Sequence, residues 1–489
     1  MCDSERFTFF EKRNLVMTNS ELTEGIKEES RGLVSIFFDA VRGVKHDYTS
    51  GPIGRAVLLL AIPMVLETLM ESIFAVVDVF FVSRLGAGAV ATVGLTESVM
   101  MLIYTVAMGL GIGVAAIVAR RIGERDADGA GDGAAQAVFL GLVIATVIGI
   151  VGGVFAPDIL RLMGGDAEVL AGVAYTRILM GGNATVLLLF LINAAFRGAG
   201  DATIAMRVLW LANGINLVLD PVLIFGLGPF PRMELAGAAT ATTIGRGTAV
   251  LLQLYLLVKG SGNLRVKREH VRPNWSLMWR MVKLSATGTF QIFIGSASFI
   301  GLVRILSTFG SIALAGYTIG IRVIIFAILP SWGMSNAAST MVGQALGAND
   351  PDRAEKAAWI AARYNMVFLG VLGILFQLFA PLIVSAFTTE PATMAYAVAC
   401  LRIVSAGFLF YAFGMVLTQA FNGAGDPWTP TFINLFCFWL FELPVAYLLA
   451  HTFGFGPNGV FAAMALSSST LAVVSAVIFR RGRWKLKTV

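Results

Sequence analysis

Apolar residues occur along the chain in twelve long segments, separated by short polar or charged stretches. These segments begin near residues 55, 89, 134, 167, 202, 235, 279, 312, 356, 394, 429 and 459. At about 20 residues, each segment is long enough to cross the hydrocarbon core of a bilayer as an α-helix. The pattern therefore predicts an all-α integral membrane protein with twelve transmembrane helices.

The composition agrees with this prediction and excludes several other classes of protein. Of the 489 residues, 57% are hydrophobic and only 13% are charged, whereas soluble domains carry about a quarter charged residues. The three cysteines and three histidines are scattered, with neither the spacing of a zinc site nor that of a disulfide framework. We expect no metal, no cofactor and no nucleic-acid partner.

An amphipathic stretch precedes the first apolar segment, within a cytoplasmic extension predicted to span residues 1–51. Its apolar side chains recur at helical spacing, with polar or charged residues opposite them: Leu33, Val34, Phe37, Phe38, Val41 and Val44, against Arg31, Ser35, Asp39, Arg42 and Lys45. This pattern favours a helix lying in the membrane interface, and a flexible tail is the alternative. The start of the chain lacks the apolar core of a cleavable signal, so we expect the first helix to direct insertion.

Basic residues are concentrated on one side of the predicted membrane spans. The stretches ARRIGER, KGSGNLRVKREHVRP and DRAEKAAWIAAR follow the second, sixth and eighth helices, and RRGRWKLK closes the chain. The alternate loops contain only Arg84, Arg161 and Arg232. Because cytoplasmic loops are the basic ones, both termini are expected in the cytoplasm, in a bacterial or archaeal inner membrane.

Three motifs occur twice in nearly one register. RLGAGAVATVGL matches TFGSIALAGYTIG, and GERDADGA from Gly123 matches GANDPDRA from Gly347, both displaced by 224 residues. FRGAGD at 196–201 recurs as FNGAGD at 421–426, displaced by 225. Six helices per copy is an even number, so both copies insert in the same sense. This predicts two lobes related by a pseudo-two-fold axis along the membrane normal, with the substrate site between them.

The expected organisation follows from the repeat. It comprises an N-lobe of residues 52–260, a basic cytoplasmic linker of residues 261–278, a C-lobe of residues 279–482 and a basic tail of residues 483–489.

Acidic residues interrupt two of the apolar segments. On the first helix, Glu71 lies about 40° and Asp78 about 20° round from Glu67, so all three share one stripe. On the fifth, Asn216 and Asp220 are four residues apart and also share a face. Asp78 and Asp220 are both expected roughly 10 Å inside the outer ends of their helices. They are therefore candidates for one shared cavity.

A carboxylate at the bilayer centre costs about 2.5 to 3.5 kcal/mol, so such residues face the protein interior and usually mark an ion or proton pathway. Burial and like-charged neighbours favour the protonated form of a carboxyl group, which makes proton loading a plausible role. With Asn216 and backbone carbonyls supplying further oxygens, the same cluster is also a candidate sodium site. The alternative is a static ion pair with Arg177 or Arg246.

Two prolines lie inside the acid-bearing helices. Pro63 is in the first helix, and Pro221 directly follows Asp220 in the fifth. Proline removes a backbone donor and kinks a helix, so both positions are candidate hinges for alternating access. Proline is also tolerated in spanning helices without such a role.

The second lobe has a different character, because its tenth and eleventh helices are rich in Phe, Tyr, Trp and Met and carry one acid, Glu442. Aromatic and thioether side chains line adaptable pockets for flat, apolar ligands. We therefore take Gln291, Tyr411 and Glu442 as candidates for a substrate cavity. Packing against lipid and neighbouring helices is the alternative for the aromatic residues.

Taken together, these features resemble the multidrug and toxic compound extrusion (MATE) family of the MOP flippase superfamily, over about residues 52–482. The resemblance rests on two six-helix copies, Pro63 followed by Asp78, the NLVLDPVLIFG stretch with its NxxxDP element, GAATAT on the sixth helix and the paired GAGD loops. It implies that Asp78, Asn216 and Asp220 bind the coupling cation, with Thr242 as a neighbour. Glu67 and Glu71 are additional to the family pattern, and their role is open.

The resemblance further implies a secondary active multidrug efflux antiporter that works by alternating access. NorM-like members add acids on the seventh and tenth helices, where this chain has Gln291, Gly295 and Tyr411. That departure is similar to the DinF-like branch and favours protons over sodium as the coupling ion. Organic cations or amphipathic drugs are the expected substrates, and a monomer in the bilayer is the expected state.

Other functions fit the sequence less well. A flippase for a lipid-linked sugar, the runner-up, needs a strongly cationic cavity to hold pyrophosphate. No GxxxxGK[ST] phosphate loop occurs, and neither HExxH nor GxSxG appears, which argues against an ATPase and an intramembrane enzyme. A passive channel does not explain two copies around a carboxylate cavity.

Overall fold

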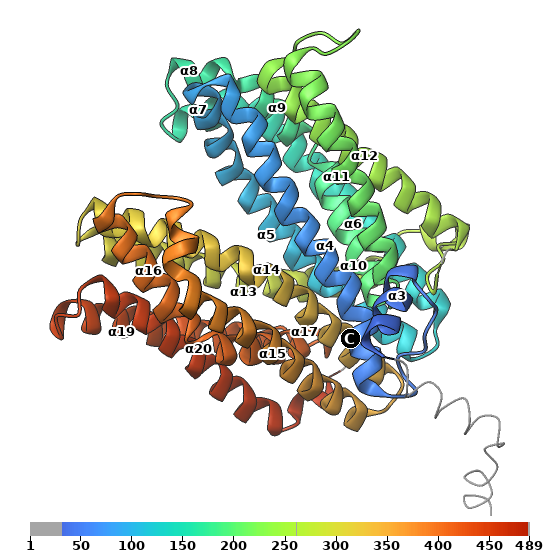
Figure 1. Cartoon of the computed structure of the whole chain (residues 1–489). Coiled ribbons are helices and arrows are strands. Elements are labelled where there is room, and N and C mark those ends of the chain that lie inside the picture. Colours follow the sequence, from blue (N-terminus) through green and yellow to red (C-terminus); the bar gives the residue numbers. More distant parts are fainter. Residues whose placement is uncertain (1–31, 261, 488–489) are drawn as a thin grey trace, which may run out of the picture.

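The computed structural model describes residues 32–260 and 262–487, which form a bundle of helices joined by loops (Figure 1). Residues 1–31 of the predicted extension, Arg31 among them, lie outside the described residues. Two sets of long helices follow α3 (Leu33–Arg42) along the chain, and we call them the N-lobe and the C-lobe.

The N-lobe contains α4 (Ile53–Val82), η1 (Ser83–Leu85), α5 (Ala87–Gly123), α6 (Ala127–Val154), α7 (Ala156–Leu162), α8 (Ala167–Ala171), α9 (Val173–Gly181), α10 (Ala184–Gly198), α11 (Ala202–Phe225) and α12 (Glu234–Lys259). After η2 (Arg268–Val271), the C-lobe contains α13 (Trp275–Ser307), α14 (Ser311–Gly347), α15 (Pro351–Ser385), α16 (Pro391–Ser405), α17 (Phe408–Gly423), α18 (Trp428–Asn434), η3 (Leu435–Glu442), α19 (Leu443–Tyr447), η4 (Leu448–Thr452) and α20 (Pro457–Arg480), before η5 (Arg483–Leu486).

The predicted number of membrane spans is confirmed. In the described chain, ten helices are long and apolar enough to cross a membrane, and two bent pairs bring the number to twelve when each pair is one span. The pairs are α9 with α10, bent by 41°, and α16 with α17, bent by 55°. Several helices start before their apolar segment, because Asp126 and Asp350 cap α6 and α15 by accepting from Gly129 N and Arg353 N.

The two lobes pack through reciprocal contacts, as a pseudo-two-fold axis requires. A Cβ atom on Gly109 of α5 would overlap Thr289 of α13, and one on Gly333 of α14 would overlap Met64 and Val65 of α4. Gly109 and Gly333 are 224 residues apart, as are Val65 and Thr289. Glycine at these positions lets the helix backbones of the two lobes approach closely.

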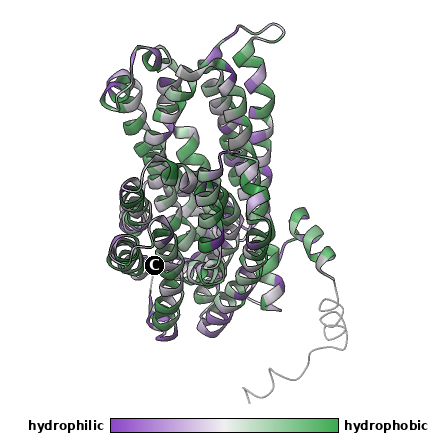
Figure 2. Cartoon of the chain, turned by 60° about the vertical axis from the view of Figure 1, so that its left-hand side comes forward, coloured by the Kyte–Doolittle hydropathy of each residue, from purple (hydrophilic) through white to green (hydrophobic). Residues whose placement is uncertain are grey.

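Each lobe has its own apolar core, and the surface around both lobes is also apolar. The core of the N-lobe includes Phe196 and Leu187, and that of the C-lobe includes Phe408 and Phe461. Large apolar side chains are exposed along whole helix faces, for example Val143, Val147, Ile150 and Val154 on α6, and Val371, Ile374, Leu378 and Leu382 on α15. Hydrophobic residues cover most of the length of the helices (Figure 2), as expected for faces in contact with lipid.

The lobes meet at the end where both described chain ends lie, which we call the shared end, and their ribbons diverge towards the other end (Figure 1). Helix α3 forms as predicted: it buries Ala40 and exposes Val34, Phe37 and Phe38. Residues 43–51, which we call the strap, then run to α4. Arg353 of the C-lobe donates to the carbonyls of Tyr48, Ser50 and Gly51 in the strap. On the N-lobe side, Arg207 donates to the carbonyls of residues 41 and 42, at the end of α3.

Candidate cation-coupling site

The acidic stripe of α4 begins with a buried ion pair. Glu67 is 4% exposed, and its Oε1 lies 2.8 Å from Nη1 of Arg197 on α10. Asn193 donates to the same oxygen at 3.2 Å and in turn accepts from Gln253 of α12 at 2.5 Å. Glu67 therefore has the static partner that the alternative interpretation anticipated, although the partner is Arg197.

Sequence reasoning missed Arg197 and its neighbours as site residues. Arg197 lies in the FRGAGD motif, which was used only to detect the repeat, and Asn193 precedes it by one helical turn. A basic and an amide side chain four residues apart on an apolar helix were the available signal. Of the two arginines proposed as partners, Arg177 is exposed and donates to the carbonyl of Gly153.

One arginine lies among the remaining acids of the stripe. Arg246 of α12 donates to the hydroxyl of Tyr104 at 3.0 Å, and its guanidinium lies 5.8 Å from the centre of the Tyr104 ring. It is within electrostatic range of both Glu71 and Asp78, each of which is half-buried. No direct ion pair closer than 4.0 Å joins Arg246 to either acid in the described chain. This single positive charge is thus shared among several carboxylates.

The structure brings Asp78 and Asp220 together, as the depth argument predicted. Asp220 of α11 is fully buried, and Asp78 is within its electrostatic range. Oδ1 of Asp78 is enclosed and has no hydrogen-bond partner among the described residues. Glu97 of α5, which the sequence analysis did not single out, also interacts electrostatically with Asp78. The result is a group of carboxylates with too few positive charges to neutralise them.

Asn216, Asp220 and Thr242 form one hydrogen-bonded network between α11 and α12. In the amide orientation that satisfies all three residues, Asn216 donates to Oδ2 of Asp220 at 2.6 Å. Its carbonyl oxygen then accepts from the Thr242 hydroxyl and the Thr242 backbone N–H, each at 2.9 Å. The spacing on α11 therefore does place Asn216 and Asp220 on one face, and the Thr242 side chain is their neighbour.

The two prolines do not interrupt their helices. Both α4 and α11 are continuous through Pro63 and Pro221. The large bends occur instead at Gly182–Asn183 and Ala406–Gly407, between the paired helices of the fourth and tenth spans. The role of the prolines as hinges stays a prediction, and the glycine-containing breaks are further candidates.

The candidates in the C-lobe are only partly brought together. Glu442 ends η3, is 4% exposed and contacts the Ser467 hydroxyl of α20. Tyr411 is within electrostatic range of Glu442 and accepts a hydrogen bond from Trp332. Gln291 is buried on α13 with its Oε1 unpartnered among the described residues, and no hydrogen bond joins it to Tyr411 or Glu442 there.

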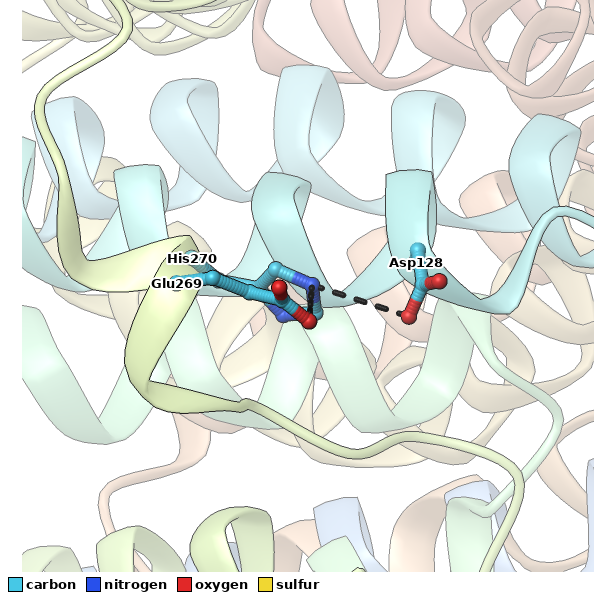
Figure 3. A group of neighbouring side chains, drawn as sticks. All are labelled: Asp128, Glu269 and His270. Atoms are coloured by element: carbon cyan, nitrogen blue, oxygen red, sulfur yellow. Dashed lines mark ion pairs between the residues drawn. The ribbon is translucent and has the colours of Figure 1, made fainter.

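One cluster has the composition of a metal site. Asp128, Glu269 and His270 gather near the shared end (Figure 3). Nζ of Lys267 already lies 2.5 Å from Asp128 and 3.5 Å from Glu269, and its hydrogen bond to Asp128 raises the pKa of the ammonium. Nδ1 of His270 accepts from the Lys267 backbone N–H, so the neutral ring carries its proton on Nε2, which faces the carboxylates. The cluster is an ion-pair network whose cation is the lysine.

Comparisons with known proteins agree with this architecture. The sequence matches the MatE family twice, over residues 63–222 and 289–448. It is 27% identical to YoeA, a probable multidrug resistance protein of Bacillus subtilis, over 81% of this chain and 87% of that protein. It is 28% identical to an FAD transporter of Shewanella oneidensis, over 83% and 90% of the two chains.

A solved structure of an outward-facing multidrug resistance MATE transporter of the MOP superfamily superposes with a TM-score of 0.83, at 27% identity, over 90% of this chain and 98% of that one. Two copies of the family pattern, a whole-chain structural match and long relatives that export drugs agree with one another. The chain therefore belongs to the MATE family of multidrug efflux transporters, which are multi-pass membrane proteins and not enzymes.

Proposed function

We propose that this transporter is a secondary active antiporter that exchanges protons for drug-like organic cations or amphipathic compounds by alternating access. The observation that carries the proposal is the pairing of Asp78 with Asp220, with one enclosed carboxylate oxygen that has no partner in the described chain. Two neighbouring carboxylates away from water are unstable together in the charged form, so a proton is the simplest ligand for them.

Protons fit this site better than sodium. Sodium sites in transporters use backbone carbonyls freed by unwound helices. Here α4 and α11 stay helical throughout, and only the carbonyls of Leu59 and Leu217, four residues before the prolines, lose their intrahelical donor. The amide oxygen of Asn216 is already bonded to Thr242. The carboxylates are thus the main oxygens left for a cation.

The charge of the site favours cationic or neutral cargo. Arg246 is within electrostatic range of Glu71 and Asp78, and Asp220 and Glu97 add further negative charge beside Asp78. Such a surface repels phosphates. This balance argues against a flippase for a lipid-linked pyrophosphate, and against the cargo named for the Shewanella relative.

The distribution of basic residues supports an orientation with both termini in the cytoplasm. Lysine and arginine gather at the shared end: Arg120, Arg121, Lys259, Arg265, Lys267, Arg268, Arg353, Lys356, Arg480, Arg481, Arg483, Lys485 and Lys487. The loops at the other end contain Arg84, Arg161 and Arg232. By the positive-inside rule the shared end faces the cytoplasm of a bacterial or archaeal cell.

In this orientation the lobes meet on the cytoplasmic side, and opening there must separate the glycine contacts between α4, α5, α13 and α14. Pro63, Pro221 and the glycine breaks are the positions at which helices can bend. Because the paired acids lie in the N-lobe, coupling in the first lobe is the DinF-like arrangement that we propose for this chain.

Reconstituted vesicles with an imposed proton or sodium gradient test the proposal. Wild-type protein should extrude a cationic dye against its gradient when protons flow inward, and a sodium gradient alone should not drive extrusion. D78N and D220N should each reduce proton-driven extrusion to the level of protein-free vesicles. D352N, which changes an exposed acid on α15, is the matched control and should transport at the wild-type rate. Normal proton-driven transport by both D78N and D220N would refute the proposed coupling.

A further inference from the structure

The fold gives Glu442 a defined counterpart in the N-lobe. Gly237 of α12 packs on the backbone of Leu223 and Ile224, and Gly459 of α20 packs on that of Leu449 and Ala450 in the same way. These contacts set a displacement of 226 residues between α11 and its partner span, as do the two family matches.

At that displacement, Glu442 occupies the position of Asn216. The helix that packs against it shows the same correspondence: Gly245 of α12 contacts Asn216, and Ser467, which occupies the position of Gly245 in α20, contacts Glu442. The C-lobe thus has a carboxyl group where the N-lobe has the amide next to Asp220.

The surroundings of Glu442 differ from those of a structural acid. Its side chain is buried, and no lysine or arginine of the described chain forms an ion pair with it. Arg304 and Arg322, the arginines expected in this lobe, are both exposed. Glu67, which is equally buried, has Arg197 at 2.8 Å. An unpaired buried carboxylate is unfavourable unless it takes up a cation.

The neighbouring helices present neutral groups to Glu442. Tyr317 of α14 and Tyr411 of α17 lie within its electrostatic range, as does Cys437 on its own span. Helix α20 contributes Ser467, and α13 places no charged group against the carboxyl. The Tyr317 hydroxyl is 3% exposed and has no hydrogen-bond partner among the described residues. A polar atom buried without a partner beside this carboxyl indicates a group whose bonding changes during the transport cycle.

The backbone around Glu442 is also unusual. The segments Leu435–Glu442 and Leu448–Thr452 are π-helical, whereas the equivalent α11 is α-helical throughout. Wide helical turns of this kind occur frequently at functional sites. With 4% of the residue exposed, the carboxyl has room for a proton and none for an organic cation.

From these observations we infer that Glu442 and Ser467 form a second proton-binding site, in the C-lobe, in addition to the carboxylates of the N-lobe. The inference rests on proton-driven transport as proposed above. It assigns the proton to a carboxylate oxygen of Glu442, which Ser467 positions. The C-lobe then takes part in coupling, in contrast to an arrangement confined to the first lobe.

The first experiment measures how far a fixed pH gradient can concentrate the dye in vesicles that contain the full chain. One coupled proton contributes a factor of about ten to the limiting ratio per pH unit, so E442Q should reach a ratio about tenfold below wild type. E442D, which keeps a carboxyl group, should restore most of the loss. A wild-type ratio for E442Q overturns the inference.

The second experiment detects the proton directly and separates the two proposals. Infrared difference spectra of purified protein are recorded across a pH titration, and E442Q should lose one band of a protonated carboxyl group that S467A keeps at a shifted midpoint. D220N should lose a different band. Loss of the Glu442 band alone, with D220N unchanged, would refute the N-lobe proposal and leave the C-lobe site. No lost band in a folded, monodisperse E442Q sample would refute the C-lobe site.

Discussion

Glu67 and Asp78 lie on the same face of α4, about 16 Å apart along the helix, yet their surroundings are opposite in character. Glu67 meets an arginine and an asparagine on α10, supported by a glutamine on α12. Asp78 meets other acids, and one of its oxygens has no partner in the described chain. The first arrangement stabilises one structure. The second gains a partner only when a cation arrives.

This contrast shows that burial alone does not identify a coupling residue. Both acids carry the cost of leaving water, and the difference is whether the fold provides a fixed positive charge. A paired acid holds α4 against α10 in every state of the cycle, whereas an unpaired one can exchange its proton. The comparison between these two regions can be broken or sharpened by four measurements.

The largest effect is expected from removing the fixed charge. R197Q leaves Glu67 buried without its ion-pair partner, which costs about 3 to 5 kcal/mol in comparable cases. The thermal unfolding temperature in detergent should therefore fall steeply. The double variant E67Q/R197Q should recover most of the loss, because neither charge then remains buried. Equal losses for the single and double variants would show that the ion pair is not what stabilises this region.

The second measurement compares stability and transport in the two acids. E67Q should lower the unfolding temperature while the folded protein transports at the wild-type rate. D78N should do the reverse: its unfolding temperature is expected to be equal to or above that of wild type, because a neutral amide avoids the cost of an enclosed, unpartnered oxygen. Its gradient-driven extrusion should be lost. A transport defect in folded E67Q would place Glu67 on the proton pathway and remove the distinction.

A smaller effect is expected at the shared end, where the strap joins both lobes. R353A removes three hydrogen bonds to the carbonyls of Tyr48, Ser50 and Gly51, with an expected loss of about 1 to 3 kcal/mol. If the strap holds this end closed, R353A should also raise the labelling rate of a cysteine placed at Ala338, which is fully buried between the lobes. K356A, an exposed change on the same helix, is the control. Unchanged labelling in R353A would show that the strap does not restrain opening.

The fold was largely predictable, because twelve apolar segments and a repeat in one register leave few arrangements. The grouping of Asn216, Asp220 and Thr242 was predictable for the same reason: spacing on one helix and the resemblance to the family both indicate it. Partners on other helices were harder. Neither Arg197 nor Glu97 shares a motif with the stripe, and their closeness to Glu67 and Asp78 depends on how α10 and α5 are rotated against α4. The bends at Gly182 and Gly407 were also missed, since glycine is common throughout this chain.

The correspondence of Glu442 to Asn216 could not be derived from the motif register alone. The paired GAGD loops are displaced by 225 residues, which would match Glu442 with Leu217. Only the glycine contacts of α12 and α20 show the displacement of 226 on this span. Rotation of about 100° per residue means that a shift of one residue moves a side chain to another face. Contacts between helices therefore decide which residues are equivalent.

The smallest effect concerns an acid at the shared end, outside the spans, whose burial offers a contrast with Asp78 that can be titrated. Burial raises the pKa of Asp201 to about 6, although Lys45 lies nearby and the Asn263 backbone N–H donates to its carboxylate. The folded protein therefore holds a proton between about pH 4 and pH 6 that the unfolded chain has released. The stabilisation from this group is complete below about pH 4 and is lost as the pH rises through 6. D201N cannot ionise but keeps an oxygen for Asn263, so its unfolding temperature should vary less than that of wild type across this window, with D352N as the control. An unchanged pH profile in D201N would show that this carboxyl does not take up the proton.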